Sequence, residues 1–266
     1  MSESRRQAQL PVLEVQELGA SQILLRLDLR QVPGGAEFRA GQFAQLAVPG
    51  HTLPRPLSIL RAGPESLDFL IKVVGPGTAW LAARRPGESL PVLWPLGHGW
   101  LDRLELPDPA EHWILVGGGV GIAPLIALCD QTDSSRALSV AFGFRDQEGV
   151  EAVRGLHAGR EIRISTEDGS LGRAGRVTEL LHDLLQETAG RPRRIFCCGP
   201  DPMMEAVARV AREAELPCLL SLETLMGCGI GICGGCAVPL AAGGFRLACQ
   251  DGPVFSASEL APPPLH

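Results

Sequence analysis

The 266-residue sequence predicts a β plus α/β chain built from three consecutive parts. Short alternating apolar runs between Pro and Gly turns fill residues 1–105 and predict an antiparallel β-barrel or sandwich domain. Strand and helix patterns then alternate over residues 106–215, which predicts a doubly wound parallel α/β domain. Glycines and cysteines crowd residues 216–266 and predict a small C-terminal domain.

Composition and charge limit the class of protein. A formal net charge of −6 and a pI near 5.6 argue against nucleic acid or an anionic membrane as the main partner. No apolar run approaches the ~18–20 residues of a membrane span. The start of the chain, residues 1–7, has no apolar core after it, so we expect no secretory signal. Eight cysteines, half of them in one motif, fit a reducing cytoplasm.

Four cysteines near the C-terminus carry the strongest motif. Their spacing is C-x4-C-x2-C-x12-C, formed by Cys228, Cys233, Cys236 and Cys249. The first three gaps are those of the plant-type pattern, in which four thiolates hold a [2Fe–2S] cluster. The intervening glycines permit the tight bends that turn backbone N–H groups toward sulfur. A structural zinc or a disulfide framework remains an alternative, and the spacing favours the cluster.

The other four cysteines lie in apolar stretches of the sequence. We expect them to behave as small buried hydrophobic residues, and they are Cys129, Cys197, Cys198 and Cys218.

The first third contains three local features that suit ligands. Arg55-Pro56-Leu57-Ser58 combines a guanidinium with a nearby hydroxyl in an extended frame, which suits a phosphate. Gly75-Pro76-Gly77-Thr78 leads into a helix expected over Thr78–Arg84, with Thr78 as its N-cap and an anion site at its start. The bend Pro95–Trp100 is suited to pass close to a flat ring. Each feature is weak alone.

A glycine-rich turn opens the middle part. After an expected linker at Pro107–Pro109, the buried strand His112–Val116 runs into Gly117-Gly118-Gly119-Val120-Gly121 and then a helical stretch. Strand, glycine turn and helix together form the context in which such a loop binds a dinucleotide pyrophosphate. Pro124 replaces the usual third glycine and suits the first turn of a helix. The alternative is a tight turn without a ligand.

Further strands are expected at residues 137–144, 161–166 and 194–198, with helices near 177–181 and 202–207. The last of these strands ends in Cys198-Gly199-Pro200, and ligands bind at the carboxyl ends of strands in such sheets. The stretch Gly143–Asp146 offers one basic and one acidic residue, and we favour NAD over NADP.

Taken together, these motifs resemble the ferredoxin-reductase family. The resemblance implies a Greek-key barrel that binds FAD through Arg55, Pro56, Leu57, Ser58, Leu70, Ile71, Lys72, Gly77 and Thr78. It also places Cys198, Gly199 and Pro200 beside nicotinamide and flavin, where Cys198 is either an active-site neighbour or a buried structural thiol. Many family members carry tyrosine where this chain has Leu57, so any cover over the flavin ring must be aliphatic.

Over nearly its whole length the chain resembles the electron-transfer subunits of type B dihydroorotate dehydrogenase. Besides the motifs above, Thr166–Ser170, Glu223–Cys236 and the tail Cys249–Phe255 carry this resemblance. It implies bound FAD and [2Fe–2S], and docking on a separate FMN-containing catalytic subunit, as a heterotetramer of two plus two chains. That partner would oxidise dihydroorotate for pyrimidine synthesis, and electrons would pass through this chain to NAD.

Two other readings stay open. Similar chains serve as diaphorase-type subunits of hydrogenases, sulfide dehydrogenases or ferredoxin–NADP transhydrogenases, and a redox sensor is a third class. No catalytic residue is certain from the sequence, and Cys198 and Glu223 are the candidates. A surface carboxylate is the alternative for Glu223.

Overall fold

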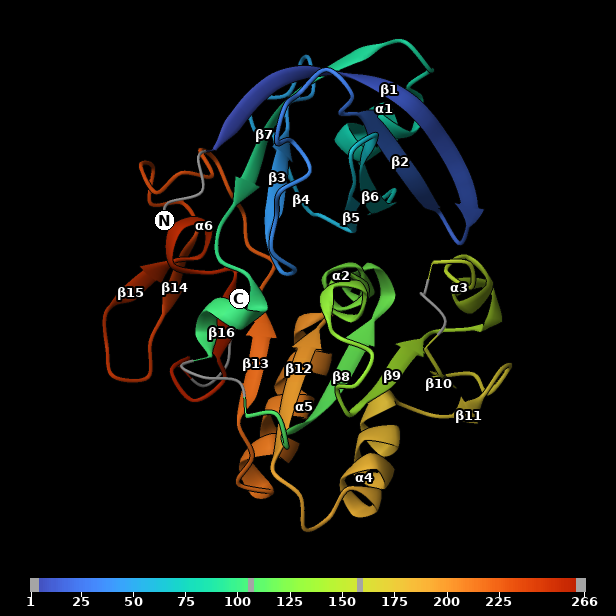
Figure 1. Ribbon diagram of the computed structural model, residues 1–266, viewed down its shortest axis with the longest axis vertical. Helices are drawn as coiled ribbons and strands as arrows, with labels where there is room; N and C mark the ends of the chain where they lie inside the picture. Colours follow the sequence, from blue (N-terminus) through green and yellow to red (C-terminus); the bar gives the residue numbers. More distant parts are fainter. Residues whose placement is uncertain (1–4, 105–107, 157–159, 262–266) are drawn as a thin grey trace.

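The computed structural model describes residues 5–104, 108–156 and 160–261. A curved antiparallel sheet forms the upper part in Figure 1, and a parallel sheet with helices forms the lower part. The C-terminal segment lies at one side of their junction. The β plus α/β organisation expected from the sequence is confirmed.

The upper sheet is a half-barrel with the strand order β4-β3-β7-β1-β2-β6-β5. Neighbouring strands are antiparallel, and β7 returns between β3 and β1, which is a Greek-key arrangement. The strands are β1 (Arg6–Gly19), β2 (Gln22–Asp28), β3 (Phe43–Leu46), β4 (Arg55–Ser58), β5 (Arg61–Ala62), β6 (Ser66–Lys72) and β7 (Ser89–Leu96). Its concave side is filled by apolar side chains such as Leu25, Phe69 and Trp94.

The short helix α1 (Pro76–Ala82) starts earlier than the sequence suggested. Gly75 is its N-cap residue, and Pro76 takes the first helical position, where a missing N–H costs nothing. The expectation that Thr78 caps the helix is therefore wrong. Its hydroxyl reaches back instead, accepting from the backbone N–H groups of Val74 at 3.0 Å and Gly75 at 3.2 Å.

The lower sheet has the order β11-β10-β9-β8-β12-β13-β16, with β16 antiparallel to β13 and the other pairs parallel. Its strands are β8 (His112–Gly118), β9 (Leu138–Phe144), β10 (Ile162–Thr166), β11 (Arg173–Ala174), β12 (Arg193–Cys198), β13 (Cys218–Ser221) and β16 (Val254–Ser256). Every residue of β8 is buried, as the central position of this strand requires.

Helices cover both faces of the lower sheet. The helices α4 (Val177–Glu187) and α5 (Asp201–Glu213) pack on one face, against side chains such as Ile114 and Cys197. The helices α2 (Ala123–Gln131) and α3 (Gln147–Glu151) pack on the other, against side chains such as Leu115 and Phe196. Because strand side chains alternate between faces, successive residues of β8 enter different cores.

The C-terminal segment makes a small hairpin and then joins the lower sheet. The hairpin strands β14 (Ala237–Pro239) and β15 (Phe245–Leu247) are followed by helix α6 (Ala248–Asp251) and by β16. Both β13 and β16 lie beyond residue 215, so two strands of the C-terminal part complete the lower sheet.

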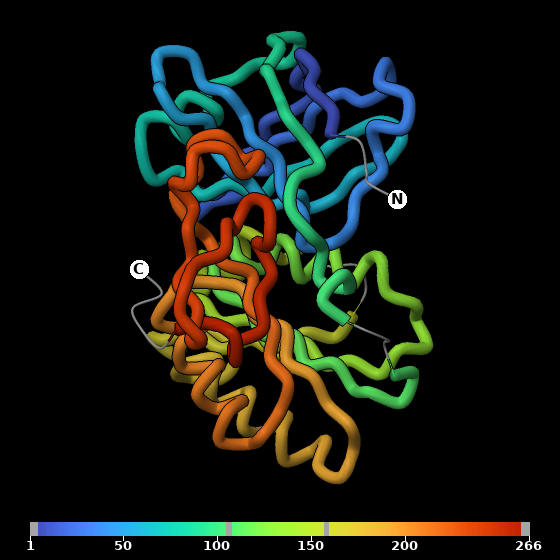
Figure 2. Tube along the Cα trace, turned by 90° about the vertical axis from the view of Figure 1, so that its left-hand side faces the viewer, coloured from blue at the N-terminus to red at the C-terminus, as the bar shows by residue number. Residues whose placement is uncertain are grey.

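The three parts share their cores. One cluster of buried side chains joins Leu70 of the half-barrel to Ile122 and Phe142 below it. A second joins Phe43 of the half-barrel to Leu220 of the lower sheet and Cys249 of the C-terminal segment. Figure 2 shows this segment, in orange and red, lying against both other parts. Within the described ranges, no helix is long and apolar enough to cross a membrane.

Candidate functional site

The arginine and the glycine expected at the flavin phosphates lie side by side. Arg55 begins β4, and its guanidinium lies over Gly77 in the first turn of α1. A Cβ at residue 77 would come within 2.2 Å of Arg55 Nε, so only glycine leaves room for this arrangement. The half-buried guanidinium also donates to Nδ1 of His51 at 3.0 Å and to the carbonyl O of Leu53 at 2.5 Å. A positive fork held beside a glycine turn fits a phosphate.

The remaining residues expected at FAD occupy two strands. Leu57 and Ser58 of β4 are half-buried and pair with Ala44 and Phe43 of β3. On β6, the side chains of Leu70 and Ile71 are buried in two different cores, whereas Lys72 is exposed at the strand end. The structure therefore gives Leu70 and Ile71 a packing role that the sequence did not separate from ligand binding.

The glycine-rich loop and the Cys-Gly-Pro segment meet directly. The loop runs from the end of β8 through the 3-10 turn η2 (Gly119–Ile122), and the segment follows β12. A Cβ at Gly121 would lie 2.6 Å from Cα of Gly199, and one at Gly118 would lie 2.6 Å from Sδ of Met203. A glycine is thus needed at residue 121, where the two strand ends approach each other. Gly119 has a φ of +56°, and a Cβ added there would meet nothing within 4 Å.

Cys198 and Glu223, the two candidate catalytic residues, lie close enough for the charge of Glu223 to act on the Cys198 thiol. Burial raises the pKa of the Cys198 thiol, and the charge of Glu223 raises it further. A hydrogen bond with Ser221 lowers this pKa in part. Cys198 therefore keeps its proton at neutral pH and is no thiolate nucleophile. Glu223 is exposed, yet the protein packed around it raises its pKa and the Asp201 carboxylate adds to the rise. Because water reaches Glu223, part of this rise is screened.

The cysteine loop, residues 227–236, directs backbone N–H groups at the sulfur atoms of the expected cluster ligands. Cys228 Sγ accepts from the N–H groups of Ile230, Ile232 and Cys233 at 3.5, 3.3 and 3.4 Å. Cys249 Sγ accepts from Gly231 N–H at 3.2 Å, and the Sγ atoms of Cys236 and Cys249 lie 3.2 Å apart. These N–H donors lower the pKa of Cys228 to about 6, and the N–H group of Ile230 has the largest effect. Such donors stabilise thiolate ligands of a cluster.

Exposure differs among the four expected cluster ligands. Cys233 is exposed, Cys228 is intermediate, and Cys236 and Cys249 are buried. Burial, followed by the nearby Cys236, raises the pKa of Cys249 to about 12. Among the residues that the structure describes, no three His, Cys, Asp or Glu side chains converge on a point that a single metal ion could occupy. The donor set of four thiols with N–H groups pointed at sulfur fits an iron–sulfur cluster.

The C-terminal segment is joined to the half-barrel at two places. Gln45 of β3 bonds to the cysteine loop near Cys228. At the second place, the carbonyl O of Gly252 accepts from His98 N–H at 2.6 Å, and Arg103 of the 3-10 turn η1 (Trp100–Arg103) donates to the carbonyl O of Val254 at 2.7 Å. The bend Pro95–Trp100, expected beside a flat ring, thus packs against the cluster segment.

His51 and Gln45 are two site residues that sequence reasoning missed. His51 lies in a loop and has no motif around it, so its contact with Arg55 had no signal in the sequence. Gln45 had one, because it is a polar residue inside the apolar run 43–48 and is only 5% exposed in the structure. Such a residue must find partners inside the protein.

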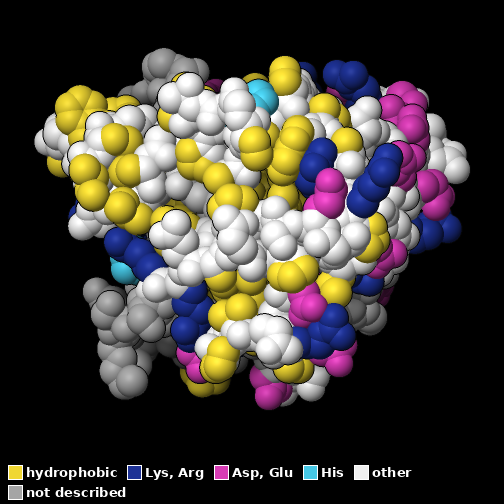
Figure 3. All heavy atoms as spheres, turned by 90° about the horizontal axis from the view of Figure 1, so that it is seen from above, with side chains coloured by type: hydrophobic (Ala, Val, Ile, Leu, Met, Phe, Trp, Pro, Cys, Tyr) yellow, Lys and Arg dark blue, Asp and Glu magenta, His cyan; other side chains and the backbone are white. Residues whose placement is uncertain are grey.

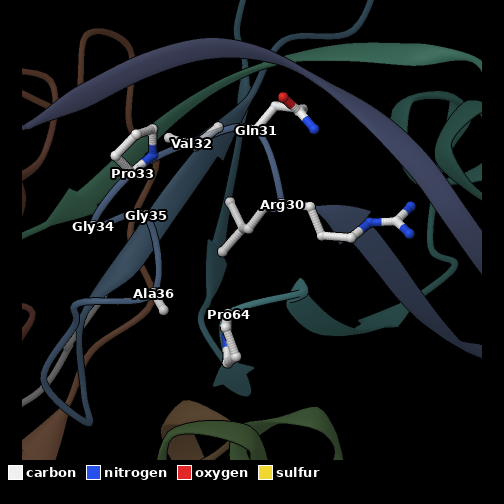
Figure 4. Close-up of a pocket in the computed structure, with 9 residues that line it drawn as sticks. Arg30, Gln31, Val32, Pro33, Gly34, Gly35, Ala36 and Pro64 are labelled. Atoms are coloured by element: carbon white, nitrogen blue, oxygen red, sulfur yellow. The ribbon is translucent and has the colours of Figure 1, made fainter.

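Among the described residues, two hollows are lined by none of the residues expected at the cofactors. One of about 380 Å³ is lined by the loop Leu29–Ala36 and Pro64 on the half-barrel, and the side chain of Arg30 points away from it (Figure 4). Arg30 forms an ion pair with Asp28. The other, of about 150 Å³, is apolar and lies between α2, α3, β9 and β10, next to the glycine loop at Ile122.

Comparison with known proteins agrees with this geometry. Residues 223–261 match the iron–sulfur cluster binding domain of dihydroorotate dehydrogenase B. The electron transfer subunit of dihydroorotate dehydrogenase B (NAD(+)) from Caldanaerobacter subterraneus is 36% identical over 85% of this chain and 88% of its own length. A probable electron transfer subunit from Thermococcus kodakarensis is 34% identical over 84% and 87% of the two chains.

Solved structures show the same architecture. The NADH-dependent reduced ferredoxin-NADP oxidoreductase superposes with a TM-score of 0.80 at 25% identity, over 98% of this chain and 91% of that chain. A ferredoxin NADP+ reductase from Neisseria gonorrhoeae, solved with FAD and NADP, has a TM-score of 0.64 at 19% identity, over 79% and 92%. With the curated relatives at 36% identity over most of their length, the chain belongs to the family of electron transfer subunits of dihydroorotate dehydrogenase B.

Proposed function

We propose that this chain relays electrons between NAD and an FMN-containing catalytic subunit that oxidises dihydroorotate, and that it holds FAD and a [2Fe–2S] cluster to do so. One observation carries the proposal. The cysteine loop contacts the half-barrel at Gln45, and the C-terminal segment that contains it continues into β16 of the lower sheet, so the expected cluster ligands belong to a segment that contacts both other parts.

When bound, FAD can take an electron pair as hydride from a nicotinamide and release single electrons to a [2Fe–2S] centre. The chain's own residues provide the positions for this. Arg55 and Gly77 would hold the flavin phosphates, with Ser58 and Thr78 nearby on the same two elements. Cys228, Cys233, Cys236 and Cys249 would hold the cluster, and the backbone N–H groups that point at their sulfurs would offset its negative charge.

For the nucleotide, the Gly117–Gly121 loop would hold the pyrophosphate, and Cys198–Pro200 would contact the nicotinamide. Cys198 acts there as a neutral thiol that shapes the site, because burial holds its proton in place. We propose NAD as the nucleotide, in keeping with the NAD(+) in the names of the curated relatives.

The partner subunit docks beside the exposed Cys233. Large apolar side chains are exposed there: Leu225 is 83% exposed, Ile232 is 79% exposed, and Leu53, which borders Gly227 of the loop, is 44% exposed. Viewed from above, hydrophobic side chains gather on the left, the side on which β14 and β15 lie in Figure 1, and acidic ones lie mainly on the right (Figure 3). An exposed apolar patch of this kind marks a protein interface.

We further propose a heterotetramer of two relay and two catalytic chains in the cytoplasm. The proposed domains are 1–105 for FAD, 106–215 for NAD and 216–266 for the cluster, with β13 and β16 of the last completing the middle sheet.

The first experiment is the visible absorption spectrum of the anaerobically purified chain, before and after NADH. Flavin bands with a broad iron–sulfur shoulder, both bleached by NADH, are expected. A colourless protein would overturn the relay. Co-expression with the FMN subunit should then give a complex that reduces NAD with dihydroorotate.

One observation supports a second function. The solved structure that superposes at a TM-score of 0.80 is an NADH-dependent ferredoxin-NADP oxidoreductase, so a diaphorase role is the alternative. Rapid NADH-linked reduction of a ferredoxin without any gain from an FMN subunit would favour it.

A further inference from the structure

A buried glutamine joins the half-barrel to the cysteine loop. Gln45 lies on β3 and is 5% exposed. In the orientation that satisfies both ends of its amide, Nε2 donates to the carbonyl O of Cys228 at 3.1 Å and Oε1 accepts from Gly229 N–H at 3.2 Å. With the amide turned over, Nε2 donates to the carbonyl O of Gly227 at 3.3 Å. In both orientations the side chain bonds to the loop around Cys228.

The loop is shaped to receive this side chain. Gly229 has a φ of +69°, and a Cβ there would lie 2.6 Å from Cδ of Gln45. The backbone thus runs directly against the amide, and only glycine permits both the conformation and the approach. Farther along, the N–H groups of Ile230 and Ile232 bond to Cys228 Sγ. The amide therefore holds the residues that precede the sulfur donors.

On the barrel side, Gln45 lies opposite Pro56 in the β3–β4 pair. Pro56 belongs to the Arg55–Ser58 segment expected at FAD. Gln45 thus lies on the strand next to β4 and contacts the cysteine loop through its side chain. In Figure 2 the orange loop rises to the level of the half-barrel, in keeping with this contact.

We propose that Gln45 is a positioning residue for the flavin–cluster pair, because it fastens the loop at Cys228–Gly229 to the strand that neighbours the flavin-binding segment. This inference rests on the proposed relay. A fastened loop keeps the N–H donors on Cys228 Sγ, and hydrogen bonds to sulfur help to set a cluster's reduction potential.

The test compares two variants of the full chain. Gln45→Met keeps the length of the side chain and removes both hydrogen bonds. Gln45→Glu keeps the acceptor for Gly229 N–H and lacks the donor for Cys228 O. Gln22→Met is the matched control, because Gln22 is an equally buried barrel glutamine, 5% exposed, on β2.

Three measurements separate the outcomes. In Gln45→Met we expect a cluster midpoint potential more negative than in the wild type, by EPR-monitored titration. Cluster reduction after NADH addition should slow at least tenfold in stopped flow, while flavin reduction changes less than twofold. Exchange of the Gly229 amide should accelerate at least tenfold in Gln45→Met, and stay slow in Gln45→Glu and Gln22→Met.

Wild-type potential and wild-type cluster reduction in Gln45→Met would overturn the proposal. So would unchanged Gly229 exchange, which can be measured without cofactors. If Gln45→Met does not fold, Gln45→Glu decides through its Gly229 amide: slow exchange supports the fastening by residue 45, and fast exchange overturns it. A wild-type chain that binds no cluster would refute the relay. Exchange of the Gly229 amide would still show whether Gln45 holds the loop.

Discussion

Single side chains at the junction owe their roles to what surrounds them. Arg55 is hydrogen-bonded to His51 and Leu53, and its guanidinium occupies the space that the missing side chain of Gly77 leaves open. A preformed guanidinium loses little freedom when it binds an anion. The same logic applies to Gln45, whose amide is already engaged with the cluster loop.

Replacing Arg55 tests the flavin site. We expect Arg55→Gln to weaken FAD binding about ten- to a hundredfold, because a hydrogen bond to a charged group contributes about 1.5–3 kcal/mol. Titration of the apoprotein with FAD, followed by flavin fluorescence, measures the change. Arg212→Gln, an exposed arginine of α5, serves as the control. Equal affinity in Arg55→Gln and wild type would remove Arg55 from the site.

Asp68 predicts a pH dependence of stability. This carboxyl of β6 is 7% exposed, and burial raises its pKa although Ser66 and Arg26 oppose the rise. The folded state thus binds more protons than the unfolded state above about pH 3.9, and stability falls as pH rises through the raised pKa. Asp68→Asn should flatten this part of the profile and raise stability at pH 7. Denaturant midpoints of both proteins from pH 4 to pH 8 measure this difference. Profiles that run parallel in Asp68→Asn and the wild type would contradict the prediction.

At the level of elements, the site is made where strand ends meet. The glycine loop after β8 and the segment after β12 approach so closely that Gly121 has no room for a Cβ. Parallel neighbours bring their carboxyl ends to one edge, which is why these two motifs, far apart in the sequence, lie side by side.

Gly121→Ala tests this contact. Its Cβ would meet backbone atoms of Gly199 and Cys198, so the two strand ends must separate. We expect a loss of about 1–3 kcal/mol in stability and slower flavin reduction by NADH, with FAD retained. Gly155→Ala, where nothing lies within 4 Å of the added Cβ, is the control. Wild-type flavin reduction in Gly121→Ala would argue against nucleotide binding at this loop.

At the level of the whole molecule, two shared cores lock the half-barrel, the lower sheet and the cluster segment into one arrangement. Polar contacts reinforce it across the barrel–sheet boundary, for example Arg61 with Asp130 at 2.6 Å and Ala20 N–H with Glu148 at 2.8 Å. A relay needs such fixed spacing between its centres, because a displaced centre slows transfer.

Cys233→Ser tests the order of the relay. We expect FAD binding and NADH oxidation with a dye to persist, and electron exchange with the FMN subunit to be lost. Dihydroorotate-dependent NAD reduction by the assembled complex measures this. Cys129→Ser, outside the motif, should leave that activity intact. Full activity in the Cys233→Ser complex would show that electrons bypass the cluster.

The sequence by itself determined the three-part order, the parallel sheet and the cysteine loop, because these follow from local periodicity, from turn residues and from ligand spacing. The pattern around Thr78 gave the helix but not its start, since Pro76 competes for the first position. Only the tertiary structure decided that Leu70 and Ile71 are core residues, that Pro95–Trp100 faces the cluster segment, and that Gln45 reaches Cys228. Those contacts join residues far apart in the chain, and local pattern carries no information about which distant backbone will fill the space beside a side chain.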